Sequence, residues 1–375
     1  MSLVKRAREK NGGGSGAGNG GTASGGGMVE LDTREREILR LLWRGGRLSR
    51  WELHRQTGVN PNAVGVDVAG LLKQGIIREC PSAVAGPGRP RIPLEIDPAV
   101  RHVVGLAFSP GRVEAGRLSL RGQLLGRPIS RSTSSPAKTI AAAQSLLRES
   151  ISEQTLGVGV SVTGFVDPTH RATLLSSSFA GPDGASLQPL YEVAGELPVI
   201  LENNMHAMAA WWLLMHQADA DEDVLLVSIN DGQLGAALLI DGRPNRGCAT
   251  GANELGHTRF FLETEMCYCG HTGCLERIVS TEFLRRRGIA NGTIFEHASH
   301  YGAANGSADP AAAKVIDEIV DYLSAGLANA VNFIRPNRLV LASELTRYPA
   351  FIDALVRSVR GRLLRELVKR VRIDM

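Results

Sequence analysis

The feature that most constrains this chain is a group of three cysteines, Cys267, Cys269 and Cys274, within the segment CYCGHTGC. Two glycines in the segment let the loop turn back, so that three thiolates can converge. Zinc in structural sites takes four thiolate or imidazole ligands, so a fourth ligand must come from nearby. His257 and His271 compete for this role, and we favour His257 because a side chain inside so tight a loop would point outward. Free buried thiols are the alternative.

The composition predicts where the protein is found in the cell and argues against a membrane partner. Five cysteines, an odd number, without the pattern of a secretion signal, predict a cytoplasmic protein rather than a disulfide framework. No apolar run reaches the roughly 18 residues that cross a bilayer, so we expect no membrane partner. Residues 1–28 are rich in glycine, serine and asparagine, and such a segment buries too little apolar surface to offset its chain entropy. We therefore predict a disordered tail there.

The pattern of helix caps and apolar residues over 29–97 predicts a winged helix-turn-helix. Two expected wing strands, Ile76–Glu79 and Ile92–Ile96, follow three expected helices. The helix starts carry N-cap residues, and a glycine is placed to end the third helix: Asp32, Ser49, Asn60 and Gly75.

This segment is also basic, which favours a phosphate backbone as its partner. Residues 40–91 contain nine Arg and Lys residues and three acidic residues, which gives a net charge of 9 − 3 = +6. The start of the third helix would enter the major groove, and the arginines of the wing would enter a narrow minor groove. A winged helix used for protein contact is the alternative. The residues expected at DNA are Arg50, Asn60, Asn62, Ala63, Gly65, Arg89 and Arg91.

Residues 98–375 mix strands and helices in a way that predicts an α/β domain of two lobes, divided near residues 215–222, with a cleft between them. The strands expected in this domain are His102–Phe108, Arg112–Leu120, Gln123–Ser130, Leu156–Val162, Pro198–Leu201, Val224–Asn230, Leu234–Ile240 and Arg338–Leu341. The expected helices are Ala137–Gln154, Met205–Ala218, Thr281–Arg287, Ala311–Ile334 and Tyr348–Val371.

Several segments resemble the ROK family (repressors, open reading frames and sugar kinases). The most specific is ELGH followed by CYCGHTGCLE, which matches the family's zinc signature. The other segments are GVGVSVTGFVDP from Gly157, ENNMHAMAAW from Glu202 and LLIDGRPNRGCATGANELGH from Leu238. A winged helix ending in GRP, with Arg89 in the wing, resembles the repressor branch, of the xylose and N-acetylglucosamine repressor type, because the kinases lack such a domain.

The resemblance implies a two-lobed actin-like, hexokinase-like ATPase fold with a structural zinc loop after the winged helix. The implied zinc ligands are His257, Cys267, Cys269 and Cys274. A sugar would meet carboxylates and amides that each bind a pair of hydroxyl groups. The implied ligand-binding residues are Gly164, Asn203, Asn204, Glu254, His257 and Glu276. Support of the zinc loop is the alternative role of Glu254 and Glu276.

The chain departs from the family's kinases where phosphoryl transfer needs charge. Their general base, an aspartate after the sugar-binding asparagine, is replaced by Asn204, and an amide is not a useful base near neutral pH. Residues 107–111, in place of their first phosphate loop, carry no carboxylate for magnesium. The second glycine-rich turn is reduced at 232–237, and a late Gly-Gly appears as Ala342-Ser343. We therefore expect no catalytic residue and no enzyme activity.

Together these features predict a DNA-binding transcriptional regulator, by first expectation a repressor, which senses a sugar or sugar derivative. We expect at least a homodimer that binds a two-fold operator in double-stranded DNA. Two alternatives remain: a sugar kinase with a regulatory DNA-binding domain, and a DNA-binding regulator whose sensor domain is not functional.

Overall fold

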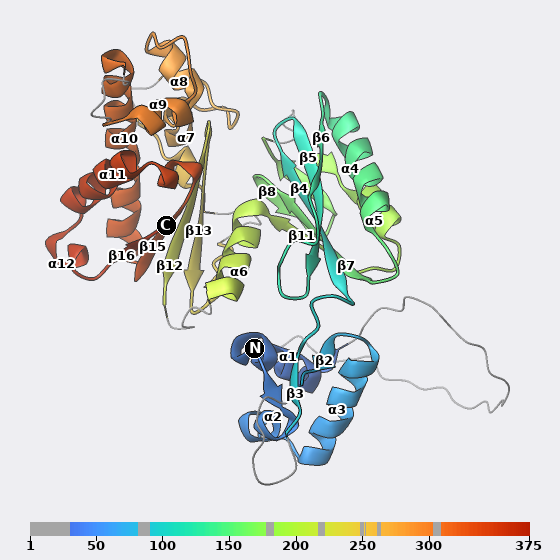
Figure 1. Ribbon diagram of the computed structural model, residues 1–375. Coiled ribbons are helices and arrows are strands. Elements are labelled where there is room, and N and C mark those ends of the chain that lie inside the picture. Colours follow the sequence, from blue (N-terminus) through green and yellow to red (C-terminus); the bar gives the residue numbers. More distant parts are fainter. Residues whose placement is uncertain are drawn as a thin grey trace, which may run out of the picture.

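The computed structural model describes residues 31–81, 91–177, 184–216, 222–247, 251, 253–260, 264–302 and 309–375. The expected tail over 1–28 and the wing residue Arg89 lie outside these residues. Among the described residues, none of the helices is long and apolar enough to cross a membrane. Figure 1 shows three bodies along the chain: a small N-terminal module and two larger α/β lobes.

The N-terminal module has three helices and a three-stranded sheet of order β1-β3-β2. The apolar faces of its helices and strands form a separate core that includes Leu42, Leu53 and Leu71, all fully buried. Both wing strands begin one residue later than predicted. The elements are α1 Thr33–Gly45, β1 Leu48–Ser49, α2 Arg50–Thr57, α3 Pro61–Lys73, β2 Ile77–Glu79 and β3 Pro93–Ile96.

The predicted helix ends of this module are confirmed. Asp32 and Ser49 each form a complete capping box with a glutamate three residues later. The side chain of Asn60 accepts from the N–H of Asn62 at 2.8 Å at the start of α3. Gly75, with a φ of 69°, follows α3 and donates its N–H to a carbonyl of the last turn at 3.0 Å, as a helix-ending glycine does.

The first lobe is built on a mixed sheet of order β11-β7-β4-β5-β6. A small sheet of order β10-β9-β8 extends it, where the sequence predicted only a turn around Gly164. The elements are β4 His102–Ser109, β5 Arg112–Ser119, β6 Ile129–Ser132, α4 Pro136–Ser150, β7 Thr155–Val162, β8 Phe165–Asp167, β9 Ala172–Leu175, β10 Ala185–Ser186, α5 Gln188–Ala194 and β11 Val199–Asn203.

Two element boundaries in this lobe were predicted wrongly. The strand expected over Gln123–Ser130 begins only at Ile129, because Gly126 has a φ of 90° and Pro128 has no N–H for the ladder. The helix expected to reach Gln154 ends at Ser150. The chain turns there, where the Ser152 N–H donates to the Thr155 hydroxyl at 2.9 Å.

The second lobe is built on a sheet of order β14-β13-β12-β15-β16. Its helices gather around α10, the longest helix of the described chain (Figure 1). The elements are β12 Val224–Asn230, β13 Gln233–Ile240, β14 Arg243–Pro244, η1 Leu255–His257, α7 Leu275–Ile278, α8 Thr281–Arg286, α9 Ile294–His300, α10 Pro310–Ile334, β15 Arg338–Ala342, η2 Glu344–Arg347, α11 Pro349–Arg362, α12 Arg365–Val368 and β16 Arg372–Asp374.

The prediction of a single helix over Tyr348–Val371 is wrong, because this range contains α11, α12 and a break between them. The first of these helices is α11. It ends at Arg362, because the amide of Asn332 on α10 binds both sides of the break. That amide donates to the Arg362 carbonyl at 3.1 Å and accepts from the Leu364 N–H at 3.0 Å. The chain then forms α12 and the edge strand β16, which pairs in parallel with β15.

Helix α6, Asn204–His216, links the two sheets (Figure 1). It follows β11 of the first sheet directly, and its apolar face packs on the second sheet through Met205, Ala209 and Trp212. At its C-terminal end the indole N–H of Trp43, on α1, donates to the Leu214 carbonyl at 3.0 Å. The same helix therefore contacts both lobes and the N-terminal module.

Candidate functional site

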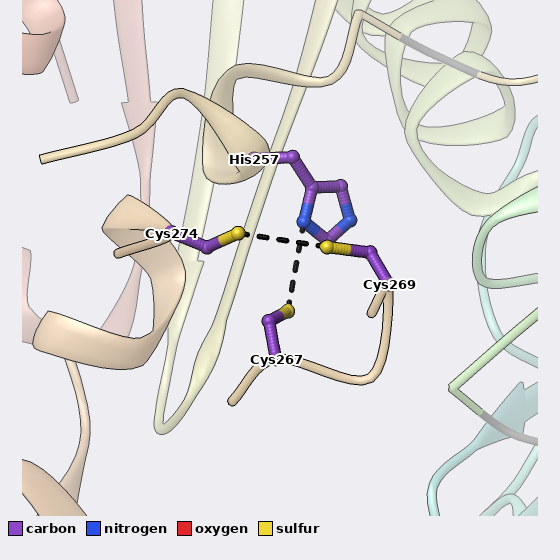
Figure 2. A group of neighbouring side chains, drawn as sticks. All are labelled: His257, Cys267, Cys269 and Cys274. Atoms are coloured by element: carbon purple, nitrogen blue, oxygen red, sulfur yellow. Dashed lines mark hydrogen bonds between the residues drawn. The ribbon is translucent and has the colours of Figure 1, made fainter. Parts of the chain in front are cut away.

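The three cysteines of the CYCGHTGC segment come together with one histidine (Figure 2). The ligand atoms of His257, Cys267, Cys269 and Cys274 all lie within 4.8 Å of one another. Their positions follow from local structure, since His257 ends η1 and Cys274 immediately precedes α7. His271, the competing ligand, is exposed and reaches only Cys269, with its Nδ1 3.8 Å from the sulfur.

The donor set of this group fits a zinc ion. Cys267 and Cys274 are almost fully buried, and burial raises the pKa of both thiols, that of Cys274 to about 11. Three thiolates this close would repel one another without a cation, whereas zinc binding removes their protons and satisfies all of them. Of the two imidazole nitrogens of His257, Nδ1 faces the Cys267 sulfur at 3.7 Å. His257 Nδ1 is therefore the atom available to a metal.

The other imidazole nitrogen points away from the sulfurs. His257 Nε2 lies 3.1 Å from the Tyr268 hydroxyl and 3.7 Å from the Glu254 carboxylate. Glu276, on α7, is only 5% exposed and accepts from the Cys267 thiol at 3.0 Å. The cluster thus contacts two carboxylates of a neighbouring cavity, Glu276 through a hydrogen bond and Glu254 at ion-pair distance.

That cavity lies between the two lobes and has a volume of about 60 Å³. Five of the six residues predicted to bind a sugar line it, and His257 does not. The sequence missed further polar lining residues, although Thr163, Asn230 and Gln233 are at or next to the ends of strands, which was a usable signal. The predicted lining residues are Gly164, Asn203, Asn204, Glu254 and Glu276, and the missed polar ones are Thr163, Ser177, Ser228, Asn230, Gln233, Asn253 and Tyr268.

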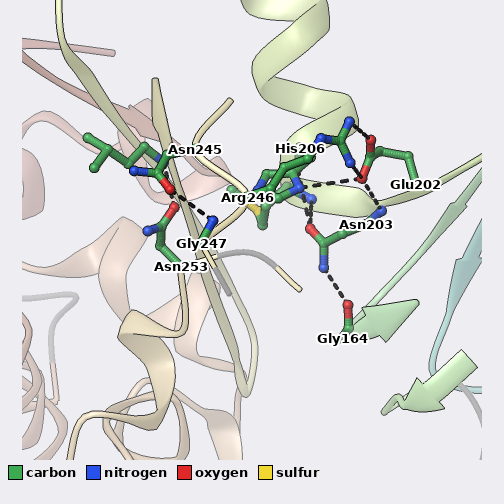
Figure 3. Close-up of polar contacts among 10 residues, drawn as sticks. Gly164, Glu202, Asn203, His206, Asn245, Arg246, Gly247 and Asn253 are labelled. Atoms are coloured by element: carbon green, nitrogen blue, oxygen red, sulfur yellow. Dashed lines mark hydrogen bonds and ion pairs between the residues drawn. The ribbon is translucent and has the colours of Figure 1, made fainter. Parts of the chain in front are cut away.

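Asn203 fixes the local structure of this cavity (Figure 3). It is 2% exposed, and its amide donates to the Gly164 carbonyl at 2.6 Å. Its side-chain oxygen accepts from the first N–H groups of α6, those of Met205 at 2.7 Å and His206 at 3.3 Å. Gly164 must be glycine, since its φ is 81° and a Cβ would lie 2.1 Å from a carbonyl oxygen.

Glu254 has an unusual protonation equilibrium for a carboxyl group. Burial beside the cavity, and then the neighbouring charge of Glu276, raise the pKa of Glu254 to about 7. Near neutral pH it can therefore either donate or accept a hydrogen bond. This property suits a group that binds hydroxyls, which both donate and accept.

A polar contact between the lobes was not predicted from the sequence (Figure 3). Arg246, just after β14 of the second sheet, forms a forked ion pair with Glu202 on β11 of the first sheet, with one bond of 3.0 Å. The Glu202 carboxylate also accepts from the Asn203 N–H at 3.0 Å and lies 3.4 Å from His206 Nδ1. The carboxylate that ties the lobes together is therefore bonded directly to the cavity residue Asn203.

Polar side chains near the reduced glycine-rich turn and at the replaced Gly-Gly make contacts within the protein. In the β12–β13 turn, the Asp231 carboxylate accepts from the N–H and the hydroxyl of Thr281 at 2.5 and 2.6 Å. The Ser343 hydroxyl donates to the Ile229 carbonyl at 2.5 Å. Asn204 is the first residue of α6 and is partly buried beside the cavity.

The residues predicted to contact DNA have several local roles. The carbonyl oxygen of the Asn60 side chain caps α3, and Arg50 pairs with Glu79 of the wing at 2.8 Å. The guanidinium of Arg91 lies 3.9 Å from the ring centre of Trp51, which is 46% exposed. The other predicted residues, Asn62, Ala63 and Gly65, lie in the first half of α3.

This geometry defines a class of protein: a two-lobed actin-like, hexokinase-like ATPase fold preceded by a small module of three helices and a three-stranded sheet. The chain belongs to the ROK family, whose sequence profile matches residues 116–374. It is 22% identical over 348 residues to the xylose repressor of Bacillus subtilis, covering 88% of this chain and 87% of that protein. It is also 25% identical over 209 residues to a glucokinase of Halalkalibacterium halodurans, covering 51% of this chain and 62% of the kinase.

Solved structures support the same fold. A ROK family transcriptional regulator, described as a homologue of the E. coli MLC protein, matches with a TM-score of 0.73 and 20% identity, covering 91% of this chain and 90% of that one. A ROK family glucokinase from Streptomyces griseus, solved with glucose and AMPPNP, matches with a TM-score of 0.60 and 22% identity, covering 72% of this chain and 93% of the kinase.

Proposed function

We propose that this protein is a DNA-binding transcriptional repressor whose kinase-like domain binds a sugar or sugar derivative without phosphorylating it. The observation that carries the proposal is the position of α6. Its first residues, Asn204 and Met205, line the cavity, and its last turn accepts the hydrogen bond from Trp43 of the winged module. A ligand that moves the first turn of α6 would therefore also move its last turn, which contacts the proposed DNA-binding module. Similarity to a xylose repressor over 88% of this chain and 87% of that protein supports the same function.

The chemistry of the cavity supports binding rather than catalysis. Asn204, where a general base would be needed, cannot take a proton near neutral pH. Asp231, next to the reduced glycine-rich turn, and Ser343, at the position of the late Gly-Gly, form hydrogen bonds within the protein. The amides and carboxylates of the cavity remain suited to pairs of sugar hydroxyls.

The proposed zinc site holds the sugar-binding carboxylates in place. His257, Cys267, Cys269 and Cys274 would hold the ion, which supplies structural rigidity and no chemistry. His257 then presents its Nε2 towards Glu254. Orientation of cavity groups by a metal ligand is a common use of such contacts.

The ion pair between Glu202 and Arg246 is the proposed element that responds to ligand. It connects the lobes, and its carboxylate is bonded to the Asn203 backbone. A sugar that binds one arrangement of the lobes better than another shifts the population of α6 positions. In a homodimer, this changes the distance between two winged helices and hence the fit to a two-fold operator.

The test compares operator affinity with and without a panel of monosaccharides and their phosphates, and measures ATP hydrolysis in the same samples. A ligand-dependent change in affinity without sugar-dependent ATP turnover supports the proposal. Turnover at roughly 1–100 per second would instead identify a kinase. Operator binding that no ligand alters, combined with no heat of binding in calorimetry, would identify a regulator with a non-functional sensor.

A further inference from the structure

A second cavity lies where the N-terminal module meets both lobes. Its volume is about 780 Å³, against about 60 Å³ for the cavity between the lobes. Small-molecule sites in proteins usually span roughly 300–1,000 Å³. The cavity is bounded by α1, the loop after β5, the start of β7, the C-terminal half of α6 and the β13–β14 turn. No residue lines both cavities, so this junction cavity is a separate site.

The walls of the junction cavity are apolar and come from different parts of the molecule. Leu39 and Trp43 belong to α1, Leu120 follows β5, and Leu213 and Leu214 belong to α6. Leu120 of the first lobe also packs against the core of the winged module. Apolar cavities of this kind hold apolar ligands in preference to water.

The rim of the same cavity is basic. Arg36, Arg40 and Arg44 repeat every four residues along one face of α1, and Arg243, the first residue of β14, also lines the cavity. Arg40 is bonded to an acidic neighbour on α1. Across the described parts of the chain, no carboxylate lies within ion-pair distance of the other three arginines, and Asp241 is the one acidic residue in the lining. Cations beside an apolar cavity favour a ligand with an anionic group.

We propose that the junction cavity binds a small amphipathic anion, whose apolar body lies between α1 and α6 and whose charged group meets Arg44 and Arg243. Such a ligand touches the DNA-binding module and both lobes at once. Its affinity therefore depends on how these parts are arranged, and by linkage its binding changes the affinity for DNA. The inference concerns a site outside the sugar cleft, and its binding test does not depend on the proposed sugar effector.

The first test titrates the full chain with 8-anilinonaphthalene-1-sulfonate, an apolar fluorophore with one anionic group. We expect saturable binding that octanoate displaces and octylamine, of the same chain length but opposite charge, does not. Leu214→Asp adds a negative charge to the wall at a position already 42% exposed, and should weaken dye binding about tenfold. Leu364→Asp, at a position 62% exposed beside α12, is the matched control and should leave it unchanged.

A second variant keeps the test independent of folding effects at Leu214. The double change Arg44→Gln and Arg243→Gln alters only exposed side chains and should weaken dye binding about tenfold, whereas Arg285→Gln on α8 should not. Equal displacement by octanoate and octylamine would overturn the proposal. So would unchanged dye binding by the double variant, and a loss of affinity for all DNA sequences in that same variant would assign these arginines to the phosphate backbone instead.

Discussion

Replacement of Asn203 by alanine tests how the cavity and α6 are held together. The change removes the acceptor that caps α6, which costs about 1 kcal/mol. It also leaves the Gly164 carbonyl without its 2.6 Å partner, which costs about 1–2 kcal/mol more. We therefore expect a loss of about 2–3 kcal/mol in the free energy of unfolding of the two-lobed domain, together with weaker binding of the proposed ligand.

The assay is urea unfolding followed by tryptophan fluorescence, because Trp211 and Trp212 both lie on α6. Asn204→Ala is the matched control. Its side chain makes no hydrogen bond among the described residues, so the free energy of unfolding should change by less than about 0.5 kcal/mol. Equal losses in Asn203→Ala and Asn204→Ala, or no loss in either, would refute the role given to Asn203.

Three further predictions follow from the other parts of the molecule. Purified protein should contain one equivalent of zinc, which Cys274→Ser loses and Cys80→Ser, at a buried cysteine outside the cluster, retains by metal analysis. Asn204→Asp should not produce sugar-dependent ATP hydrolysis, measured by coupled assay, because the nucleotide loops remain defective. Hydrogen bonds from two arginines lower the pKa of Glu95 to about 2, so this carboxylate stabilises the wing above pH 4.5 and the stability is lost as the pH falls towards 2. In thermal melts between pH 7 and 3, Glu95→Gln should therefore show a smaller pH dependence than the unmodified protein.

Features that depend on neighbours in sequence could be predicted well. The caps at Asp32 and Ser49 need only residues three positions apart, and both formed as expected. The preference for His257 over His271 followed from loop length alone, and the structure brings His257 to the three sulfurs. The antiparallel pair of β12 and β13 agrees with the prediction, because two apolar runs in the sequence flank a short turn.

Features that depend on distant partners could not be predicted. Glu202 and Arg246 are far apart in sequence and meet only when the lobes assemble. The break after Arg362 depends on Asn332 of another helix, and the apolar pattern continues through it. The junction cavity likewise has walls from segments that no local pattern connects. Sequence reasoning therefore found five lining residues of the cleft, and it missed the other polar ones and the contacts that couple the cleft to the rest of the molecule.

The central claim, that the chain is a sequence-specific DNA-binding regulator, is tested most directly by DNA selection. The full-length protein is incubated with fragmented genomic DNA at near-physiological salt, and the retained fragments are sequenced. The account predicts enrichment of a few two-fold-symmetric sites, because specific binding exceeds non-specific binding by roughly 10³–10⁷-fold. Retention of bulk DNA without preferred sites, or of no DNA, would contradict it.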